Sequence, residues 1–197
     1  MRIVALIPVK SLEHVKSRLS ETLDLAHRIQ LIEETLRRLV HVLRAEPRVE
    51  RIVVVTRDAS VAEWMHSRAI DVVSEQGHGL NLALMEARAA ITPCAALLIL
   101  PADVAAVSSH DVAALIDAAE TAAYPAVVIA PDRHGHGTNA LLLHPPSAID
   151  FLFGPDSFHL HIAAAEQSGA QVCIYRSESL GLDLDLPEDY DLYSQQW

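Results

Sequence analysis

Residues 2–8 read RIVALIP, a β-branched and aliphatic run ended by a proline, which is typical of a short buried strand. Apolar residues then recur at helical spacing from Leu25 to Arg44, and residues 51–56 (RIVVVT) form a second buried-strand pattern. A strand, a helix and a strand in this order indicate a parallel sheet that helices cover. The opening of the chain therefore predicts an α/β fold.

The same alternation continues through the first two-thirds of the chain. Further helices are expected at residues 59–68, 79–90, 111–122, 157–169 and 187–193, and further strands at residues 71–74, 95–100, 126–130, 140–143 and 171–175. The consecutive strands 126–130 and 140–143 indicate an antiparallel element, because a Gly-rich loop joins them. We expect one domain over residues 1–197, with three layers and a mixed, mostly parallel sheet.

Composition and charge exclude several classes of function. The formal net charge of −11 argues against a nucleic-acid partner, because phosphate backbones attract basic proteins. No apolar run has the length of a membrane span, and the N-terminus runs straight into a strand, so we expect a cytoplasmic protein with no membrane partner. Cys94 and Cys173 lie far apart without a CxxC motif, which predicts buried free thiols.

The only two lysines, Lys10 and Lys16, lie with Arg18 in the loop that follows the first strand. This concentration of positive charge suggests a site for the phosphate tail of a nucleotide, and the alternative is a solvated basic loop. The loop has neither a GxxxxGK[ST] nor a GxGxxG motif, so side chains would have to hold the phosphates. The tail from Glu178 to Asp191 is acidic, which fits an anionic ligand bridged by a metal to carboxylates.

Three aspartates follow predicted strands or alternate with leucines. Asp103 comes just after an apolar strand, where ligands of open α/β sheets bind, and its oxygens suit Mg²⁺. Asp183 and Asp185 alternate with leucines, and in a strand both carboxylates would lie on one face and repel unless a cation separates them. A metal shared by the three aspartates is one interpretation. A turn-capping Asp103 and a solvated strand face are the alternatives.

Three glycine-containing segments could contact a ligand. Gly77–Asn81 (GHGLN) lets the backbone approach a ligand, and Asn81 could bind a base edge or cap the next helix. Residues 132–139 (DRHGHGTN) form a turn whose amides and Thr138 hydroxyl suit an anion, whereas no matching ligand cluster supports a transition metal on its histidines. Residues 153–158 (FGPDSF) lead into a helix, where amides and Ser157 could bind a phosphate or carboxylate, with Ser157 also a candidate N-cap.

Together these segments resemble the guanylyltransferases of coenzyme F-420 biosynthesis. The resemblance covers essentially the whole chain, and GTNALLL together with FGPxSF is its specific part. Its motifs are PVK at 8–10, KSRL at 16–19, GLN at 79–81, LPAD at 100–103, APDRxGxGTNALLL at 130–143, FGPxSF at 153–158 and LDxDxPEDY at 182–190. Those enzymes activate a small phosphorylated acid, which is 2-phospho-L-lactate in archaeal members and phosphoenolpyruvate in many bacterial ones.

The resemblance implies a GT-A-type nucleotidyltransferase fold and a role for each motif. It implies Mg²⁺ on Asp103, Asp183 and Asp185, and the small acid on Thr138, Gly154 and Ser157. The positions implied on the GTP side are Pro8, Val9, Lys10, Lys16, Arg18, Gly79, Leu80 and Asn81. Two positions depart from the family pattern: Leu152 stands where a basic residue is expected, and Ala105-Ala106 replace the commoner Pro-Leu.

The resulting hypothesis is transfer of GMP from GTP to a small phosphorylated acid, with release of pyrophosphate. Lys10, Lys16, Arg18 and Asp103 would be catalytic, and no general base is needed, because a phosphate monoester is largely dianionic at neutral pH. Phosphoenolpyruvate is favoured, and 2-phospho-L-lactate and 3-phosphoglycerate stay open. A sugar phosphate or molybdopterin nucleotidyltransferase and a non-catalytic nucleotide-binding regulatory protein are the alternative functions. A homodimer is an open alternative for the assembly.

Overall fold

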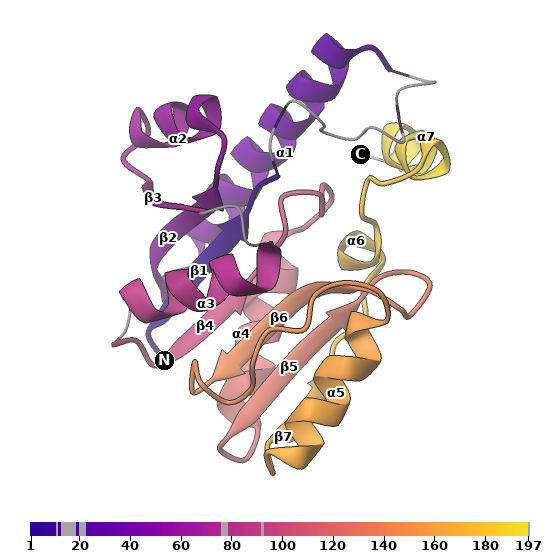
Figure 1. The fold of residues 1–197 in the computed structure, drawn as a ribbon. Coiled ribbons are helices and arrows are strands. Elements are labelled where there is room, and N and C mark those ends of the chain that lie inside the picture. Colours follow the sequence, from indigo (N-terminus) through magenta and orange to yellow (C-terminus); the bar gives the residue numbers. More distant parts are fainter. Residues whose placement is uncertain (11, 13–18, 20–22, 76–78, 92, 197) are drawn as a thin grey trace.

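A seven-stranded sheet runs through the centre of the molecule in the order β3-β2-β1-β4-β6-β5-β7 (Figure 1). The computed structural model describes residues 1–10, 12, 19, 23–75, 79–91 and 93–196. The strands are β1 (Ile3–Pro8), β2 (Val49–Thr56), β3 (Asp71–Ser74), β4 (Ala96–Ile99), β5 (Ala126–Pro131), β6 (Thr138–His144) and β7 (Gln171–Ile174). Strand β6 is antiparallel to β4 and β5, and the other pairs are parallel, which confirms the mixed, mostly parallel sheet.

Helices cover both faces of the sheet, as the alternating sequence predicts. Helices α1 (Leu25–Ala45), α2 (Ala59–His66) and α4 (Ser109–Thr121) pack on one face, and α3 (Leu80–Ile91) and α5 (Ser157–Gln167) on the other. Successive strand residues point to opposite faces, so that Ile3, Ala5 and Ile7 join the first apolar core and Val4 and Leu6 the second. These two cores make the three-layer architecture.

The chain after β7 differs from the prediction. A short helix, α6 (Glu178–Gly181), was not expected, and no strand forms at residues 182–186 before α7 (Pro187–Gln196). The alternation of burial nevertheless holds, because Leu182 and Leu184 are buried while Asp183 is only half-buried. The segment is an irregular extended connection, in which the Asp185 amide donates to the Asp183 carbonyl at 3.0 Å instead of to a neighbouring strand. The alternation of leucine and aspartate thus predicts which side of the extended segment is buried, but it does not predict pairing with another strand.

A third apolar cluster lies beside the carboxyl ends of β1 and β4. It contains Leu19, Leu31, Ala105 and Leu184, with Tyr190 and Tyr193 of α7 packed against it. Figure 1 shows α7 (yellow) near the N-terminal end of α1, although the two helices are far apart in the sequence. This cluster brings the acidic C-terminal segment to the edge of the sheet where the loop after β1 begins.

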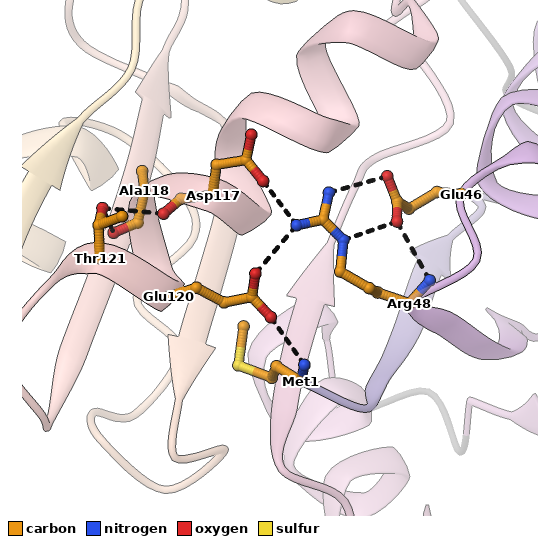
Figure 2. A network of polar contacts seen from close by, with 7 residues as sticks. All are labelled: Met1, Glu46, Arg48, Asp117, Ala118, Glu120 and Thr121. Atoms are coloured by element: carbon orange, nitrogen blue, oxygen red, sulfur yellow. Dashed lines mark hydrogen bonds and ion pairs between the residues drawn. The ribbon is translucent and has the colours of Figure 1, made fainter.

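The opposite edge of the sheet carries an ion-pair network around Arg48, which precedes β2 (Figure 2). The guanidinium donates to Glu46 at 2.7 and 3.0 Å, to Asp117 at 2.5 Å and to Glu120 at 3.0 Å. Glu120 also pairs with the amino group of Met1 at 2.7 Å. Hydrogen bonding from Arg48 holds the pKa of Glu46 below its usual range. The network joins the starts of β1 and β2 to the end of α4.

Two further properties concern the chain as a whole. Over the residues that the structure covers, none of the helices is both long and apolar enough to traverse a lipid bilayer. Cys94 and Cys173 are free thiols, as predicted, but each is only half-buried. Burial still raises the pKa of the Cys94 thiol.

Replacing Arg48 tests the contribution of this network to stability. Arg48→Met is expected to lower the free energy of unfolding by about 1–2 kcal/mol, because the Glu46 carboxylate, only 8% exposed, loses its partner. The matched control is Arg51→Met, whose ion pair with Asp71 is 46% and 55% exposed and should contribute less than about 0.5 kcal/mol. Urea denaturation measures both, and equal losses would contradict the assignment.

Candidate functional site

The carboxyl ends of β1 and β4 are neighbours, and the residues of two sequence motifs follow them directly. The pairing extends beyond the strands, since the Leu100 amide donates to the Leu6 carbonyl at 3.0 Å and the Ala102 amide to the Pro8 carbonyl at 3.3 Å. Parallel neighbours are about 4.8 Å apart. The backbone of the PVK motif therefore lies beside the backbone of LPAD, and Asp103 follows at the same edge.

The loop that begins at Lys10 is only partly described. Lys10 is exposed, and the Leu12 amide donates to the Asp58 carboxylate at 2.8 Å. Asp58 also caps α2 by accepting from Ser60 and Val61 amides, so one carboxylate fastens the beginning of this loop to the end of β2. Lys16 and Arg18 lie outside the described residues, and their predicted contacts with a nucleotide stay predictions.

The acidic segment at residues 183–185 reaches the same edge through its backbone. The Leu184 amide donates to the Asp103 carbonyl at 3.1 Å, and the Leu184 side chain packs with Leu19 and Ala105. Ala105, one of the two departures from the family pattern, is thus a contact of this segment. The three aspartates that the sequence singled out, Asp103, Asp183 and Asp185, are brought together at the carboxyl end of β4.

The three carboxylates lie close enough for the negative charges of Asp103 and Asp185 to act on Asp183. Burial, the negative charge of Asp103 and that of Asp185 raise the pKa of Asp183 to about 6, against an opposing hydrogen bond from Asn139. The Asn139 amide donates to Asp183 at 3.3 Å and to the Leu180 carbonyl at 2.9 Å. A half-buried carboxylate that carries this penalty fits a divalent cation with oxygen ligands, since a cation would reverse it.

Arg133 and Asp189 hold the acidic segment in place. Asp189 accepts from the Asp185 and Leu186 amides at 3.1 and 2.7 Å, and its other oxygen pairs with Arg133 at 2.7 Å. The Arg133 amide also donates to the Gly181 carbonyl at 2.9 Å. Sequence reasoning assigned no role to either residue, although both belong to the motifs APDRxGxGTNALLL and LDxDxPEDY.

Short helix α6 is anchored by a buried carboxylate. Asp111 accepts from the Ser108 amide at 2.9 Å, the Ser179 hydroxyl at 2.7 Å and the Tyr175 hydroxyl at 3.1 Å. Burial alone would raise the pKa of Asp111, but hydrogen bonds from Ser108, Ser179 and Ser177 outweigh it and hold the pKa below its usual range. The anchor fixes the position of α6, which ends at Gly181 just before the acidic segment.

The turn between β5 and β6 is organised by Asp132 and corrects one expectation. Asp132 accepts from the His136 and Gly137 amides at 2.9 and 2.8 Å, so these amides are not offered to an anion. A Cβ at Gly137 would lie 2.8 Å from Asp132 Oδ2, which explains the glycine. Burial opposes ionisation of Asp132, but the surrounding amides lower its pKa. The Thr138 hydroxyl is the remaining candidate of this turn.

Thr138, Gly154 and Ser157 come from two segments that the structure joins. The Phe158 amide donates to the His136 carbonyl at 2.9 Å, which links the start of α5 to the turn before Thr138. Gly154 has φ 138°, a conformation that favours glycine. Ser157 is buried as the first residue of α5. The alternative interpretation of Ser157 as an N-cap is wrong, because Asp156 occupies that position without a side-chain cap bond.

Asn81 connects the GLN motif to the FGP motif. It lies in the first turn of α3, where its side chain donates to the Phe153 carbonyl at 3.0 Å and accepts from the Phe153 amide at 2.8 Å. The structure thus shows a third role besides the base contact and the helix cap that the sequence suggested. A contact of Gly79, Leu80 and Asn81 with a nucleotide stays a prediction.

His136, Asp156 and His159 form a surface cluster beside this region. Over the described residues, they are the group of three histidine and acidic side chains whose potential ligand atoms lie within 4.8 Å of one another. The sequence argument against a metal here relied on missing partners, which the fold supplies. The three side chains also pair with one another without an ion, since Asp156 lies 2.6 Å from His159 and 3.6 Å from His136. Hydrogen bonding to these histidines lowers the pKa of Asp156.

Comparisons with known proteins agree with the architecture and the motifs. A family model described as "Guanylyl transferase CofC like" matches residues 1–193. A phosphoenolpyruvate guanylyltransferase of Rubrobacter xylanophilus is 42% identical over 96% of this chain and 92% of that protein. A 2-phospho-L-lactate guanylyltransferase of Methanothermobacter thermautotrophicus is 37% identical over 96% of this chain and 82% of that protein.

Solved structures share the fold at low sequence identity. A nucleotidyl transferase from Methanothermobacter thermautotrophicus superposes with a TM-score of 0.70 at 17% identity, covering 98% of this chain and 96% of that chain. Glucosyl-3-phosphoglycerate synthase from Mycobacterium tuberculosis, in complex with Mn²⁺, UDP and phosphoglyceric acid, has a TM-score of 0.63 at 13% identity, covering 89% and 68%. These likenesses confirm the nucleotidyltransferase fold.

The raised pKa of Asp183 predicts an unusual response to substitution. Asp183→Asn should raise the free energy of unfolding of the metal-free chain by on the order of 2 kcal/mol at pH 7.5. The folded chain binds the extra proton between the ordinary pKa of 3.8 and the folded value of about 6, and carries an unfavourable charge above it. The gain should therefore be largest above pH 6 and vanish below pH 4.

Urea denaturation in EDTA, at pH 7.5 and below pH 4, measures this gain in the free energy of unfolding. Asp191→Asn, an exposed aspartate of α7, is the control and should change little. A less stable Asp183→Asn chain at pH 7.5 would mean that the carboxylates do not repel.

Proposed function

Because this chain belongs to the CofC-like guanylyl transferase family, we propose that it transfers GMP from GTP to a small phosphorylated acid in coenzyme F-420 biosynthesis. It is a nucleotidyltransferase by family and by fold. The observation that carries the proposal is the family match over residues 1–193, together with three interacting carboxylates at the ligand edge of the sheet. We place this reaction in the cytoplasm.

Phosphoenolpyruvate is the acceptor that we propose. Relatives with that name include the one from Rubrobacter xylanophilus at 42% identity, and the relative named for 2-phospho-L-lactate is 37% identical. The two acids share a phosphate and a carboxylate, so either would present the same anionic groups to Thr138, Gly154 and Ser157. The choice between them depends on the shape around these residues.

Mg²⁺ is the cofactor that we propose, held by Asp103, Asp183 and Asp185. When bound, it would neutralise phosphate charge and stabilise the transition state. The donor set consists of carboxylate oxygens, which Mg²⁺ prefers, and their mutual repulsion in this chain favours binding of a cation. A Mn²⁺ ion with a nucleotide and a phosphorylated acid is present in the glucosyl-3-phosphoglycerate synthase structure, which supports a metal in this fold.

The protein residues position and neutralise the reactants. Lys10, with Lys16 and Arg18, would bind the triphosphate, and the acid would lie on the opposite side of the carboxylates. A phosphate oxygen of the acid attacks the α-phosphorus of GTP, the bond to the bridging oxygen breaks, and pyrophosphate leaves. The attacking phosphate is largely dianionic at pH 7, since its second pKa is about 6, and so needs no general base.

Pyrophosphate release tests the reaction directly. The chain, GTP and Mg²⁺ should release pyrophosphate with phosphoenolpyruvate, 2-phospho-L-lactate or 3-phosphoglycerate, and not with a sugar phosphate. Asp103→Asn should lower kcat at least about a hundredfold, because one charge of the cation site is lost. Release with a sugar phosphate alone would favour the same-fold alternative. Nucleotide binding without any release would favour a regulatory protein.

Lys10 is expected to act on the nucleotide side only. Lys10→Ala should raise the KM for GTP about tenfold and leave the KM for the acid unchanged, because a charge-assisted phosphate contact is lost. Arg2→Ala is the control, since Arg2 is exposed and pairs with Glu50 at the opposite edge of the sheet. An unchanged KM for GTP would remove Lys10 from the site.

A further inference from the structure

A buried histidine that the proposed reaction does not use connects two parts of the acid site. His161 lies on α5 and is 0% exposed. Its Nδ1 lies 3.0 Å from the Thr138 hydroxyl, and its Nε2 accepts from the Leu152 amide at 2.9 Å. The ring also packs edge-on against Phe153, with centroids 5.0 Å apart. Both ring nitrogens therefore have defined partners.

The partners decide which nitrogen carries the proton. A backbone N–H can only donate, so Nε2 must present its lone pair to Leu152. Burial lowers the pKa of His161 to about 4, which leaves the ring neutral at physiological pH. A neutral imidazole has one proton, and it must be on Nδ1. The ring consequently donates to Thr138 Oγ1, and the hydroxyl is the acceptor.

The direction of this hydrogen bond leaves the Thr138 proton available. A hydroxyl carries one donor and two acceptor positions, and His161 uses an acceptor position. Within the residues that the structure describes, this hydroxyl has His161 as its hydrogen-bond partner. Thr138 is only 5% exposed, so water has little access to it. Its proton can therefore be donated to an anionic oxygen.

We propose that His161 is a positioning residue for the phosphorylated acid. By donating to Thr138 Oγ1, it makes the hydroxyl an obligatory donor and aims its proton at the anionic oxygen of the bound acid. This inference rests on the proposed function, which places the acid at Thr138. The chemistry selected is a hydrogen-bond acceptor, such as a carboxylate or a dianionic phosphate, over a donor-only group such as an ammonium.

The same ring also fixes the loop before α5. Leu152 is held by His161, and the next residue, Phe153, has both its amide and its carbonyl bound to Asn81. Gly154 follows directly. One imidazole thus sets the spacing between the Thr138 hydroxyl on β6 and the Gly154 backbone, the two positions expected to bind one acid.

The protonation state can be measured without a substrate. Nitrogen-15 correlation spectra of the histidine rings should show a neutral Nδ1–H ring between pH 5.5 and 8, identified as the signal that His161→Asn removes. A neutral Nε2–H ring or a charged ring in this range would overturn the proposal, because Thr138 would then no longer be an obligatory donor.

Two substitutions separate the two hydrogen bonds of the ring. Asn is short and reaches only the Nδ1 position, so His161→Asn keeps a donor for Thr138, whereas Gln is longer and His161→Gln keeps an acceptor for Leu152. His161→Gln should raise the KM for phosphoenolpyruvate about tenfold. His161→Asn should raise this KM less, and neither substitution should change the KM for GTP. His110→Gln, an exposed histidine at the start of α4, is the control.

A double-mutant cycle with Thr138 separates positioning from general support of the fold. Thr138→Val should raise the KM for the acid, Thr138→Ser should restore it, and His161→Gln should add less than about twofold in the Thr138→Val background. An equal effect of His161→Gln in both backgrounds would refute the positioning role. If the His161 variants fail to fold, the ring signal is identified instead as the one that Thr138→Val shifts, and its protonation state decides.

Failure of the proposed function looks different from failure of this inference. A chain with an Nδ1–H ring that releases no pyrophosphate with any acid would refute the reaction. Turnover with phosphoenolpyruvate by a chain whose ring is Nε2–H would refute the positioning role alone.

Discussion

Three carboxylates crowd the carboxyl end of β4, and much of this edge serves to keep them there. The repulsion acts on Asp183, because burial and the charges of Asp103 and Asp185 raise the pKa of this carboxyl to about 6. Nothing in the aspartates themselves favours this arrangement without a cation. It persists because the backbone between them is tied down, first by the Leu184 amide on the Asp103 carbonyl and then by the packing of Leu184.

The supports of this cluster are neutral or paired, and this explains how the fold tolerates it. Asn139 donates to Asp183, and Arg133 neutralises Asp189, which in turn receives two backbone amides. Each such bond contributes about 1 kcal/mol, so a few of them offset a repulsion of the order of 2 kcal/mol. At the opposite edge, each carboxylate drawn in Figure 2 is instead paired with the positive charge of Arg48 or of the Met1 amino group. The ion pairs of Arg48 and the crowded carboxylates thus lie at different ends of the strands.

Much of the fold followed from periodicity, whereas the site did so only in part. Buried strands such as residues 96–99 can be predicted from their apolar composition. The alternation of strands with helices then indicates a mostly parallel sheet. Residues 182–186 show the limit, because a period of two reports an extended chain with one buried side but cannot supply a pairing partner. The resemblance named the positions of Asp103, Thr138 and Ser157. It placed Asn81 on the GTP side but did not reveal its hydrogen bonds to Phe153, and it was silent on His161. The partners of these two residues lie 72 and 23 residues away, and only the folded chain makes them neighbours.

The hydrogen bond from Leu184 to the Asp103 carbonyl has a consequence for synthesis of the protein. A ribosome makes Asp103 some eighty residues before Leu184, so the sheet edge around β4 is translated well before the segment that completes its set of acidic oxygens. A nascent chain can therefore fold the sheet around β4 before Leu184 is available to bind the Asp103 carbonyl. A chain truncated before Asp183 would lack this hydrogen bond and two of the three carboxylates that meet at this edge.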